Sequence, residues 1–257
     1  MKQPLLSIIT VCKDNVQDLH ITLGSIVDSL PLEKIEIIVV SGSSDENFDC
    51  ELQLFPDISQ IKIHRSNPLG VYSAMNYGLT LYNGSWVWFL NSGDLCSISD
   101  SDDFVTILSS ESNSQSNALL FYGAIRSIFS IYPIVRRPSF ISYIDKDKWF
   151  KSYPCMHPCI IVSSTSLSKS SFRYSTINRI NADQAYIKYF QNLPQIRSFK
   201  IFIAQFTLGG LSTKGPFTLL FNFLALRVPR FVRFLDDGLI LFKLFTLDII
   251  RSLSCIK

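Results

Sequence analysis

Mostly apolar, β-favouring segments alternate with segments of helical periodicity along the first part of the chain. Residues 5–12 and 35–40 are β-favouring apolar runs, which is typical of strands buried on both faces of a sheet. Between them, residues 16–30 carry apolar side chains at helical spacing, and Pro31 closes this segment. The pattern predicts two parallel strands joined by a helix.

The same alternation continues toward residue 94. A short helix is predicted over residues 48–55 and a short strand over 61–64. After Gly70, apolar and small residues recur at helical spacing as far as Tyr82. The run 86–90 is again wholly apolar and predicts a buried strand. This order predicts an α/β fold with a Rossmann-like, mostly parallel sheet and helices on both faces.

Polar clusters follow three of the expected strands, at residues 13–15, 41–45 and 91–94. In open α/β sheets, ligands bind outside the carboxyl ends of the strands. Turn residues are also needed wherever a strand ends, and this is the favoured explanation of any single cluster. Three clusters at one rim favour a nucleotide site.

The next region has a different composition. Residues 99–117 are rich in serine and acidic residues and predict a surface helix, and residues 121–137 predict a hairpin. With 257 residues, 47% of them hydrophobic, the chain is long enough for one sizeable α/β domain and an appendage. The net charge of +3 is too small to indicate nucleic-acid binding.

The six cysteines lie far apart, and no secretory signal precedes the first apolar run, so we expect them to be reduced and cytosolic. Cys155 and Cys159 flank His157 and are candidate zinc ligands. Because no second Cys/His cluster completes a set of four ligands, a zinc site is not favoured.

Eight segments, in order, carry a family resemblance. The chain resembles the family-2 inverting glycosyltransferases of the A-type (nucleotide-diphospho-sugar transferase, GT-A) fold, particularly the bacterial polysaccharide and O-antigen branch. The segments are LLSIITVCKDN, IEIIVVSGSSDE, GVYSAMNYGL, WVWFLNSGD, FYGAI, HPCII, INADQAYI and LGGLST. The ordered set spans roughly the first 213 residues, and it is more specific than any single segment.

The resemblance implies a site for a nucleoside-diphosphate sugar, with UDP-sugars favoured. Its nucleotide-binding residues would be Thr10, Val11, Lys13, Asp14, Ser41, Ser44, Asp45, Asn76, Asn91 and Ser92. Asp94, at the end of the fourth strand, would hold a Mg²⁺ or Mn²⁺ ion that bridges the diphosphate. Such an ion would neutralise charge on the leaving phosphate.

The resemblance also places Asp183 as the base that takes the proton from the acceptor hydroxyl. From the sequence alone, the favoured explanation of Asp183 is an ordinary first-turn acid of a helix capped by Asn181, and only the family resemblance reverses this preference. The residues near the sugar and the acceptor would be Trp149, His157, Gly209 and Gly210. Pro158 follows His157 where the resembling enzymes usually have Gln, which puts the role of His157 in question.

Other departures from the family pattern leave alternatives open. Ser41 stands where an acid is usual, and Asp94 is the only carboxylate in the Asn-Ser-Gly-Asp sequence. These losses motivate a second hypothesis, in which the chain is a non-catalytic scaffold. A sugar nucleotidyltransferase is less favoured, because no glycine-rich loop with Arg or Lys follows the first strand.

We expect a nucleotide-sugar half at residues 1–98, an acceptor and catalytic half at 99–213, and amphipathic C-terminal helices at 214–257. No apolar stretch in these last residues approaches the roughly 20 residues that a spanning helix needs. Basic residues among Phe and Leu favour an interfacial anchor over a helical pair packed on protein. The expected place of action is the cytoplasmic face of the bacterial inner membrane, on a polyprenyl-diphosphate-linked glycan acceptor.

Overall fold

Strand β1 (Leu6–Cys12) lies between β2 (Ile35–Ser41) and β4 (Trp86–Phe89), and it is parallel to both. Every residue of these three strands is buried. Strand β3 (Ile61–Arg65) adds to β2, also in parallel. The mostly apolar segments therefore form the parallel half of the sheet, as the sequence predicts.

The computed structural model describes residues 3–43, 60–66, 69–113, 120–129, 132–134, 157–177, 182–190, 193 and 196–207. All of them belong to one compact unit, Met1–Thr207. The predicted helix at residues 48–55 and the predicted C-terminal helices lie outside the described residues.

The second half of the sheet mixes strand directions. It contains β5 (Leu95–Cys96), β6 (Leu120–Phe129), β7 (Tyr132–Ile134), β8 (Ile160–Ser163) and β9 (Ile196–Thr207). The strand order among the described residues is β3-β2-β1-β4-β8-β6-β9-β5, with β7 paired to β6. Strands β6 and β7 are antiparallel, which confirms the predicted hairpin.

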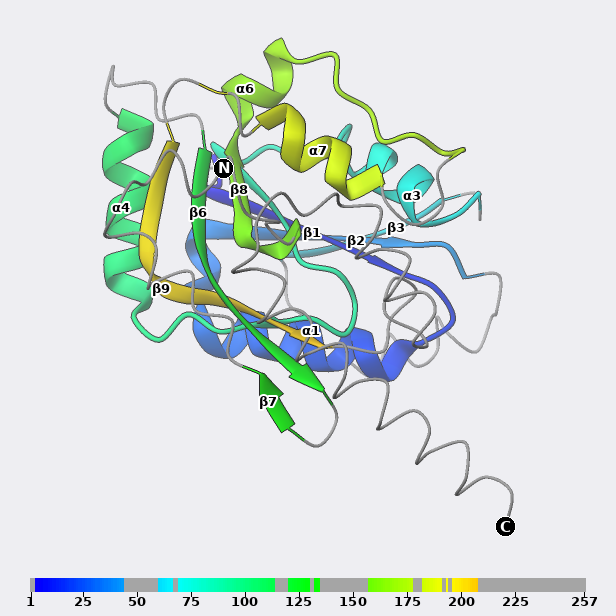
Figure 1. The fold of residues 1–257 in the computed structure, drawn as a ribbon, viewed down its shortest axis with the longest axis horizontal. Coiled ribbons are helices and arrows are strands. Elements are labelled where there is room, and N and C mark those ends of the chain that lie inside the picture. Colours follow the sequence, from blue (N-terminus) through cyan, green and yellow to red (C-terminus); the bar gives the residue numbers. More distant parts are fainter. Residues whose placement is uncertain are drawn as a thin grey trace, which may run out of the picture. The chain divides into compact units, whose positions relative to one another are not determined.

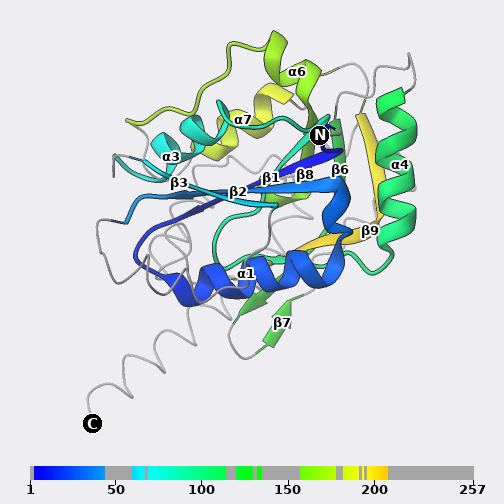
Figure 2. The same cartoon turned by 180° about the vertical axis from the view of Figure 1, so that it is seen from behind.

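Helices cover both faces of the sheet (Figure 1). Helix α1 (Val16–Ser29) lies on one face, and α3 (Val71–Gly78), α6 (Ser164–Lys169) and α7 (Ala182–Phe190) lie on the other, which the view from behind also shows (Figure 2). A single 3-10 turn, η1 (Leu32–Lys34), leads from α1 into β2. The predicted α/β fold class is confirmed.

Helix α4 (Ser101–Asn113) lies within the region that the sequence predicts as a surface helix. Phe104 and Leu108 are its fully buried residues, and Trp86 of β4 donates its indole N–H to the Leu108 carbonyl at 3.1 Å. Buried tryptophans usually find such a partner. This bond ties α4 to the start of β4.

Helix α3 ends earlier than its periodicity predicts, at Gly78 rather than near Tyr82. A Cβ on Gly78 would lie 2.6 Å from Cγ2 of Ile9, so the helix touches β1 closely here. The chain then forms a 3-10-type hydrogen bond, in which the Leu81 N–H donates to the Gly78 carbonyl at 3.1 Å. Such three-residue bonds commonly close the last turn of a helix.

Candidate active site

The loops after β1, β2 and β4 meet at the carboxyl edge of the parallel strands. The Gly42 N–H donates to the Cys12 carbonyl at 2.9 Å, and the Ser92 N–H donates to the Val11 carbonyl at 3.3 Å. The end of β1 is therefore bonded to the loop after β2 on one side and to the loop after β4 on the other. The structure brings together the polar clusters that the sequence places at one rim, as far as the described residues extend.

The loop after β1 offers exposed side chains beside a helix N-terminus. Lys13 and Asp14 are exposed, and Asp14 adopts a left-handed conformation with φ 54°. Asn15 caps α1, since its Oδ1 accepts from the Asp18 N–H at 3.0 Å. Helix N-termini favour anions, so this loop suits the predicted contact with a nucleotide.

Among the predicted nucleotide-binding residues, Thr10, Val11 and Ser41 are buried. The Thr10 Oγ1 atom has no hydrogen-bond partner. Ser41 accepts from the Ser43 N–H at 3.2 Å, which shapes the start of the loop after β2. Ser44 and Asp45 lie outside the described residues.

A tight turn follows β4 and carries Asp94. The Asp94 N–H donates to the Asn91 carbonyl at 2.9 Å, and Gly93 between them has φ +94°, a conformation that favours glycine. Thr22 of α1 fixes this turn, because its Oγ1 accepts from the Gly93 N–H at 2.9 Å and donates to the Asp94 carbonyl at 2.8 Å. Sequence reasoning missed Thr22, whose only signal is a hydroxyl within the apolar face of α1.

The turn after β4 has the chemistry of a site for a hard divalent cation. The Asp94 residue is 5% exposed, and Asn91 Oδ1 and Ser92 Oγ are buried oxygens without a hydrogen-bond partner. Carboxylate and neutral oxygens are the ligands that Mg²⁺ takes, and it often adds substrate phosphates to one or two carboxylates. The described residues contain no cluster of three or more His, Cys, Asp or Glu side chains that could hold a metal alone.

Asp183 lies in the first turn of α7. Both interpretations of this residue, as a catalytic base and as an ordinary first-turn acid, are compatible with that position. Its Oδ1 accepts from the Tyr72 hydroxyl at 3.3 Å and from the Gln184 N–H at 3.0 Å. Burial raises the pKa of the carboxyl above its ordinary value, although these two hydrogen bonds lower it. A carboxylate with a raised pKa is a better proton acceptor.

Tyr72 places Asp183 at the same edge of the sheet as the loops. Strand β3 ends at Arg65 and α3 begins at Val71, so the first turn of α3 lies at the carboxyl edge. Tyr72 belongs to this first turn, and Asp183 is bonded to it. The structure thus brings the predicted base to the rim where Asp94 lies.

His157 begins η3 (His157–Cys159) and lies in a cluster of aromatic rings. Its Nε2 is 2.8 Å from the Tyr174 hydroxyl, and its ring centroid is 5.0 Å from Phe89 and 4.9 Å from Tyr186. Burial lowers the pKa of His157 to about 3, so the ring is neutral at physiological pH. Sequence reasoning named His157 but missed Tyr174 and Tyr186.

Asn76 has a different environment from the other predicted nucleotide-binding residues. Its amide makes two hydrogen bonds to the backbone of Tyr174, so the structure gives it a role in holding the chain. Contact of Asn76 with a nucleotide stays a prediction. Trp149, Gly209 and Gly210 lie outside the described residues, as do Cys155 and the side chain of Cys159.

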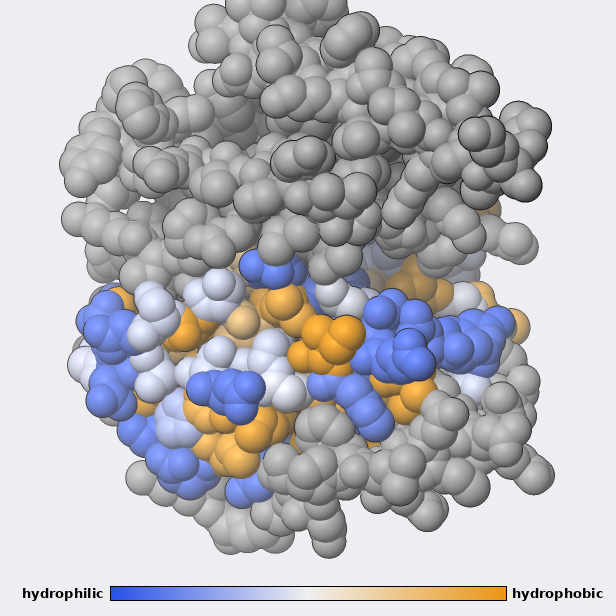
Figure 3. Space-filling view, turned by 90° about the horizontal axis from the view of Figure 1, so that it is seen from below, coloured by the Kyte–Doolittle hydropathy of each residue, from blue (hydrophilic) through white to orange (hydrophobic). Residues whose placement is uncertain are grey.

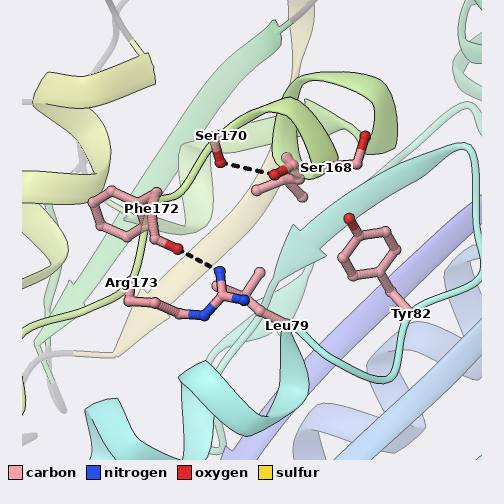
Figure 4. Close-up of a pocket in the computed structure, with 7 residues that line it drawn as sticks. Leu79, Tyr82, Ser168, Ser170, Phe172 and Arg173 are labelled. Atoms are coloured by element: carbon pink, nitrogen blue, oxygen red, sulfur yellow. Dashed lines mark hydrogen bonds between the residues drawn. The ribbon is translucent and has the colours of Figure 1, made fainter.

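A hollow of about 110 Å³ lies at the other end of α3 from Tyr72 (Figure 4). Its lining residues are Leu79, Tyr82, Leu167, Ser168, Ser170, Phe172 and Arg173. The Arg173 guanidinium turns to the Phe172 carbonyl, to which it donates at 2.7 Å. The hollow borders the aromatic cluster around His157, because the ring centroid of Phe172 is 5.2 Å from that of Tyr174 and 5.4 Å from that of Tyr186.

The surface seen from below mixes hydrophilic and apolar side chains over the described part of the chain (Figure 3). Ile21 of α1 is one exposed apolar residue, with 55% of its surface accessible.

Among the described residues, no helix is both long enough and apolar enough to cross a membrane.

Comparison with curated proteins finds glycosyltransferases of mycobacteria. The chain is 34% identical over 95 residues to the PGL/p-HBAD biosynthesis glycosyltransferases of Mycobacterium tuberculosis and Mycobacterium bovis. The aligned segment is 37% of this chain and 37% of each relative. The chain therefore matches little more than a third of the length of these relatives.

Comparison with solved structures finds S. aureus TarS. The crystal structure of TarS 1-349 in complex with UDP aligns with a TM-score of 0.64 and 14% identity, over 79% of this chain and 60% of that chain. The complex with UDP-GlcNAc aligns with a TM-score of 0.60 and 14% identity, over 79% of this chain and 58% of that chain. This similarity supports a shared GT-A fold.

The profile of the family described as "Glycosyl transferase family 2" matches residues 7–169, which is more than half of the 257 residues. The matched range begins in β1 and includes the loops after β1, β2 and β4. The prediction of the enzyme class is confirmed at the level of the family, because this chain belongs to glycosyl transferase family 2.

Proposed function

We propose that this protein transfers a sugar from a UDP-sugar to a hydroxyl group of an acceptor, with inversion at the anomeric carbon. The observation that carries the proposal is the placement of two carboxylates at one edge of the sheet. Asp94 follows β4 in a fixed turn, and Asp183 is bonded to the first turn of α3. UDP as the nucleotide is supported by the similarity to TarS, whose crystal structures include complexes with UDP and with UDP-GlcNAc.

The acceptor hydroxyl must attack the anomeric carbon from the side opposite the leaving nucleoside diphosphate. Asp183 takes the proton of this hydroxyl as the new glycosidic bond forms and the bond to the diphosphate breaks. Since the attack is direct, no covalent bond between sugar and protein is needed. The partly buried carboxylate suits this role, because its burial raises its pKa.

Asp94, with the unpartnered oxygens of Asn91 and Ser92, would hold Mg²⁺ or Mn²⁺ at the diphosphate. When bound, this ion supplies positive charge that stabilises the leaving diphosphate. Thr22 keeps the turn in place through two hydrogen bonds. We expect Lys13 and Asp14, which are exposed in the loop after β1, to contact the nucleotide.

The experiment is calorimetric titration of the purified protein with UDP, GDP and dTDP, each with and without Mn²⁺. We expect UDP to bind in a Mn²⁺-dependent manner and Asp94→Ala to lose this dependence. Asp28→Ala removes an exposed carboxylate on α1 and should bind UDP as the unchanged protein does. Binding of none of the three nucleotides would contradict the proposal.

Absence of binding would instead favour the scaffold hypothesis. One observation supports this second candidate, namely that Asp94 is the only carboxylate of the turn after β4. A scaffold would keep the fold without a functional ion site. The two hypotheses therefore differ in the outcome of the same titration.

The acceptor and the place of action belong to the proposal as well. We expect a lipid-linked glycan, such as a polyprenyl-diphosphate-linked intermediate of bacterial O-antigen or lipopolysaccharide synthesis, at the cytoplasmic face of the inner membrane. Support comes from the basic and apolar composition of residues 214–257. The full chain should float with anionic vesicles, and a chain truncated after Thr213 should not. Equal flotation of both would contradict the anchor.

A further inference from the structure

Three tyrosine rings connect the helix that carries Asp183 with helix α3. The ring of Tyr72 stacks on Tyr174, with centroids 5.8 Å apart and an interplanar angle of 17°. Tyr174 stacks in turn on Tyr186, at 5.3 Å and 15°. Tyr186 lies three residues after Asp183 on α7, so the stack returns to the helix of the carboxylate. The hydrogen bond from Tyr72 to Asp183 closes this arrangement.

The middle ring is held on more than one side. Asn76, one helical turn after Tyr72 on α3, bonds both the N–H and the carbonyl of Tyr174, at 2.8 and 2.9 Å. The Tyr174 hydroxyl lies 2.8 Å from Nε2 of His157. A ring that is fixed at its backbone and at its hydroxyl cannot shift without breaking these bonds. Tyr72 and Tyr186 therefore stack against a fixed surface.

The Tyr72 hydroxyl and the Gln184 N–H both donate to the same oxygen of the Asp183 carboxylate, Oδ1. Oδ2 is then the atom that can face an acceptor hydroxyl. We propose that Tyr72 is a positioning residue, which holds Asp183 through Oδ1 so that Oδ2 receives the acceptor proton. The catalytic role of Tyr72 rests on the proposed function. The hydrogen bond between Tyr72 and Asp183 is independent of it.

The three phenols of the stack and the ring of His157 are uncharged at neutral pH. Burial raises the pKa of the phenols of Tyr72, Tyr174 and Tyr186 above the ordinary value, and it lowers that of His157 to about 3. Burial raises the pKa of the Asp183 carboxyl, and the hydrogen bond from the Tyr72 hydroxyl lowers it. Removal of this hydroxyl should raise the pKa of Asp183.

The test is Tyr72→Phe, which keeps the stacked ring and removes the hydroxyl. The titration of Asp183 is followed by NMR on protein labelled with ¹³C at aspartate carboxyls, and the signal is assigned by its loss in Asp183→Asn. We expect the midpoint to move to higher pH in Tyr72→Phe. Tyr77→Phe, a partly exposed tyrosine on the same helix, should leave it in place. An unchanged midpoint in Tyr72→Phe would contradict the hydrogen bond between the Tyr72 hydroxyl and Asp183.

Activity gives the second readout, with UDP-GlcNAc as donor and release of UDP as the signal. Tyr72→Phe should lower kcat about tenfold, the size expected for one hydrogen bond to a charged group. The acidic limb of the kcat profile should move to higher pH with the NMR midpoint, and calorimetric binding of UDP should be unchanged. A midpoint that moves while the acidic limb stays in place would overturn the positioning role.

The two measurements separate this inference from the proposed function. If the unchanged protein neither binds UDP nor releases it from UDP-GlcNAc, the proposed function fails, and the catalytic role of Tyr72 fails with it. The NMR titration still decides whether the hydroxyl of Tyr72 holds Asp183. If the unchanged protein is active and Tyr72→Phe equals it in kcat and pH profile, the inference alone fails.

Discussion

The hydroxyl of Ser7 donates a hydrogen bond of 2.6 Å to the carboxylate of Glu36, its direct neighbour on the adjacent strand. Both residues are almost fully buried within the parallel half of the sheet. The same carboxylate accepts from the Asn83 N–H at 2.6 Å and from Lys62 at 2.9 Å, and Ser7 accepts from the Gly84 N–H at 2.7 Å. A buried charge thus holds the turn that precedes β4.

This network predicts a pH dependence of stability. Burial raises the pKa of Glu36, but the hydrogen bonds from Ser7, Lys62 and Asn83 outweigh it, so the pKa lies below the ordinary 4.5. A carboxylate with a depressed pKa contributes stability above pH 4.5, and the contribution is lost as pH falls through the folded-state pKa. Glu36→Gln should lower the free energy of unfolding at pH 7 by about 1–3 kcal/mol.

Urea unfolding at pH 7 and at steps below pH 4.5 measures this effect. The gap between Glu36→Gln and the unchanged protein should narrow as pH falls. Glu33→Gln changes an exposed carboxylate in η1 and should follow the unchanged protein throughout. A gap that stays constant down to low pH would show that the charge of Glu36 is not the stabilising feature.

A second prediction concerns the amide of Asn76. It links α3 to the Tyr174 backbone across 98 residues of sequence, through one donated and one accepted hydrogen bond. Asn76→Ala leaves two partly buried backbone groups without their partner, so we expect a loss of about 1–3 kcal/mol in urea unfolding. Gln17→Ala removes an exposed amide and should cost little. Equal stability of both variants would contradict this role.

Two helical glycines should respond to alanine with opposite signs. A Cβ on Gly78 would lie 2.6 Å from Cγ2 of the buried Ile9, whereas a Cβ on Gly24 would meet nothing within 4 Å. Gly78→Ala should therefore destabilise the protein by about 1–3 kcal/mol through overpacking. Gly24→Ala should stabilise it by about 0.5–1 kcal/mol, because alanine favours a helix. Thermal unfolding distinguishes the two.

The parallel half of the fold could be predicted because its strands are buried on both faces. The apolar runs of β1, β2 and β4 leave a continuous signal, and Pro31 marks where the helix after β1 ends. The helix end at Gly78 could not be predicted, because apolar residues continue at helical spacing beyond it as far as Tyr82. Periodicity records which face of a helix is buried and does not mark where the hydrogen bonds change to the 3-10 pattern.

The candidate site also contains residues that the sequence could predict and residues that it could not. Asp94 and Asp183 could be named because short motifs carry them, and the strand order then brings the polar loops to one edge. Thr22 could not, because its role depends on the turn after β4 folding back onto α1. Tyr174 is likewise defined by partners far away in sequence, Asn76 and His157. Hydrogen bonds between distant segments leave no pattern along the chain.

The last prediction concerns Asp183 itself. Asp183→Asn keeps the shape of the side chain and an oxygen that can accept from Tyr72 and from the Gln184 N–H, so the fold should persist. It removes the proton acceptor, and loss of a general base costs about 10²–10⁴-fold in rate. We expect transfer from UDP-GlcNAc to fall by at least about 10²-fold while calorimetric binding of UDP is unchanged. Asp103→Asn, an exposed acid in the first turn of α4, should retain full activity. Activity of Asp183→Asn equal to that control would rule out Asp183 as the base, because an amide cannot take a proton at neutral pH.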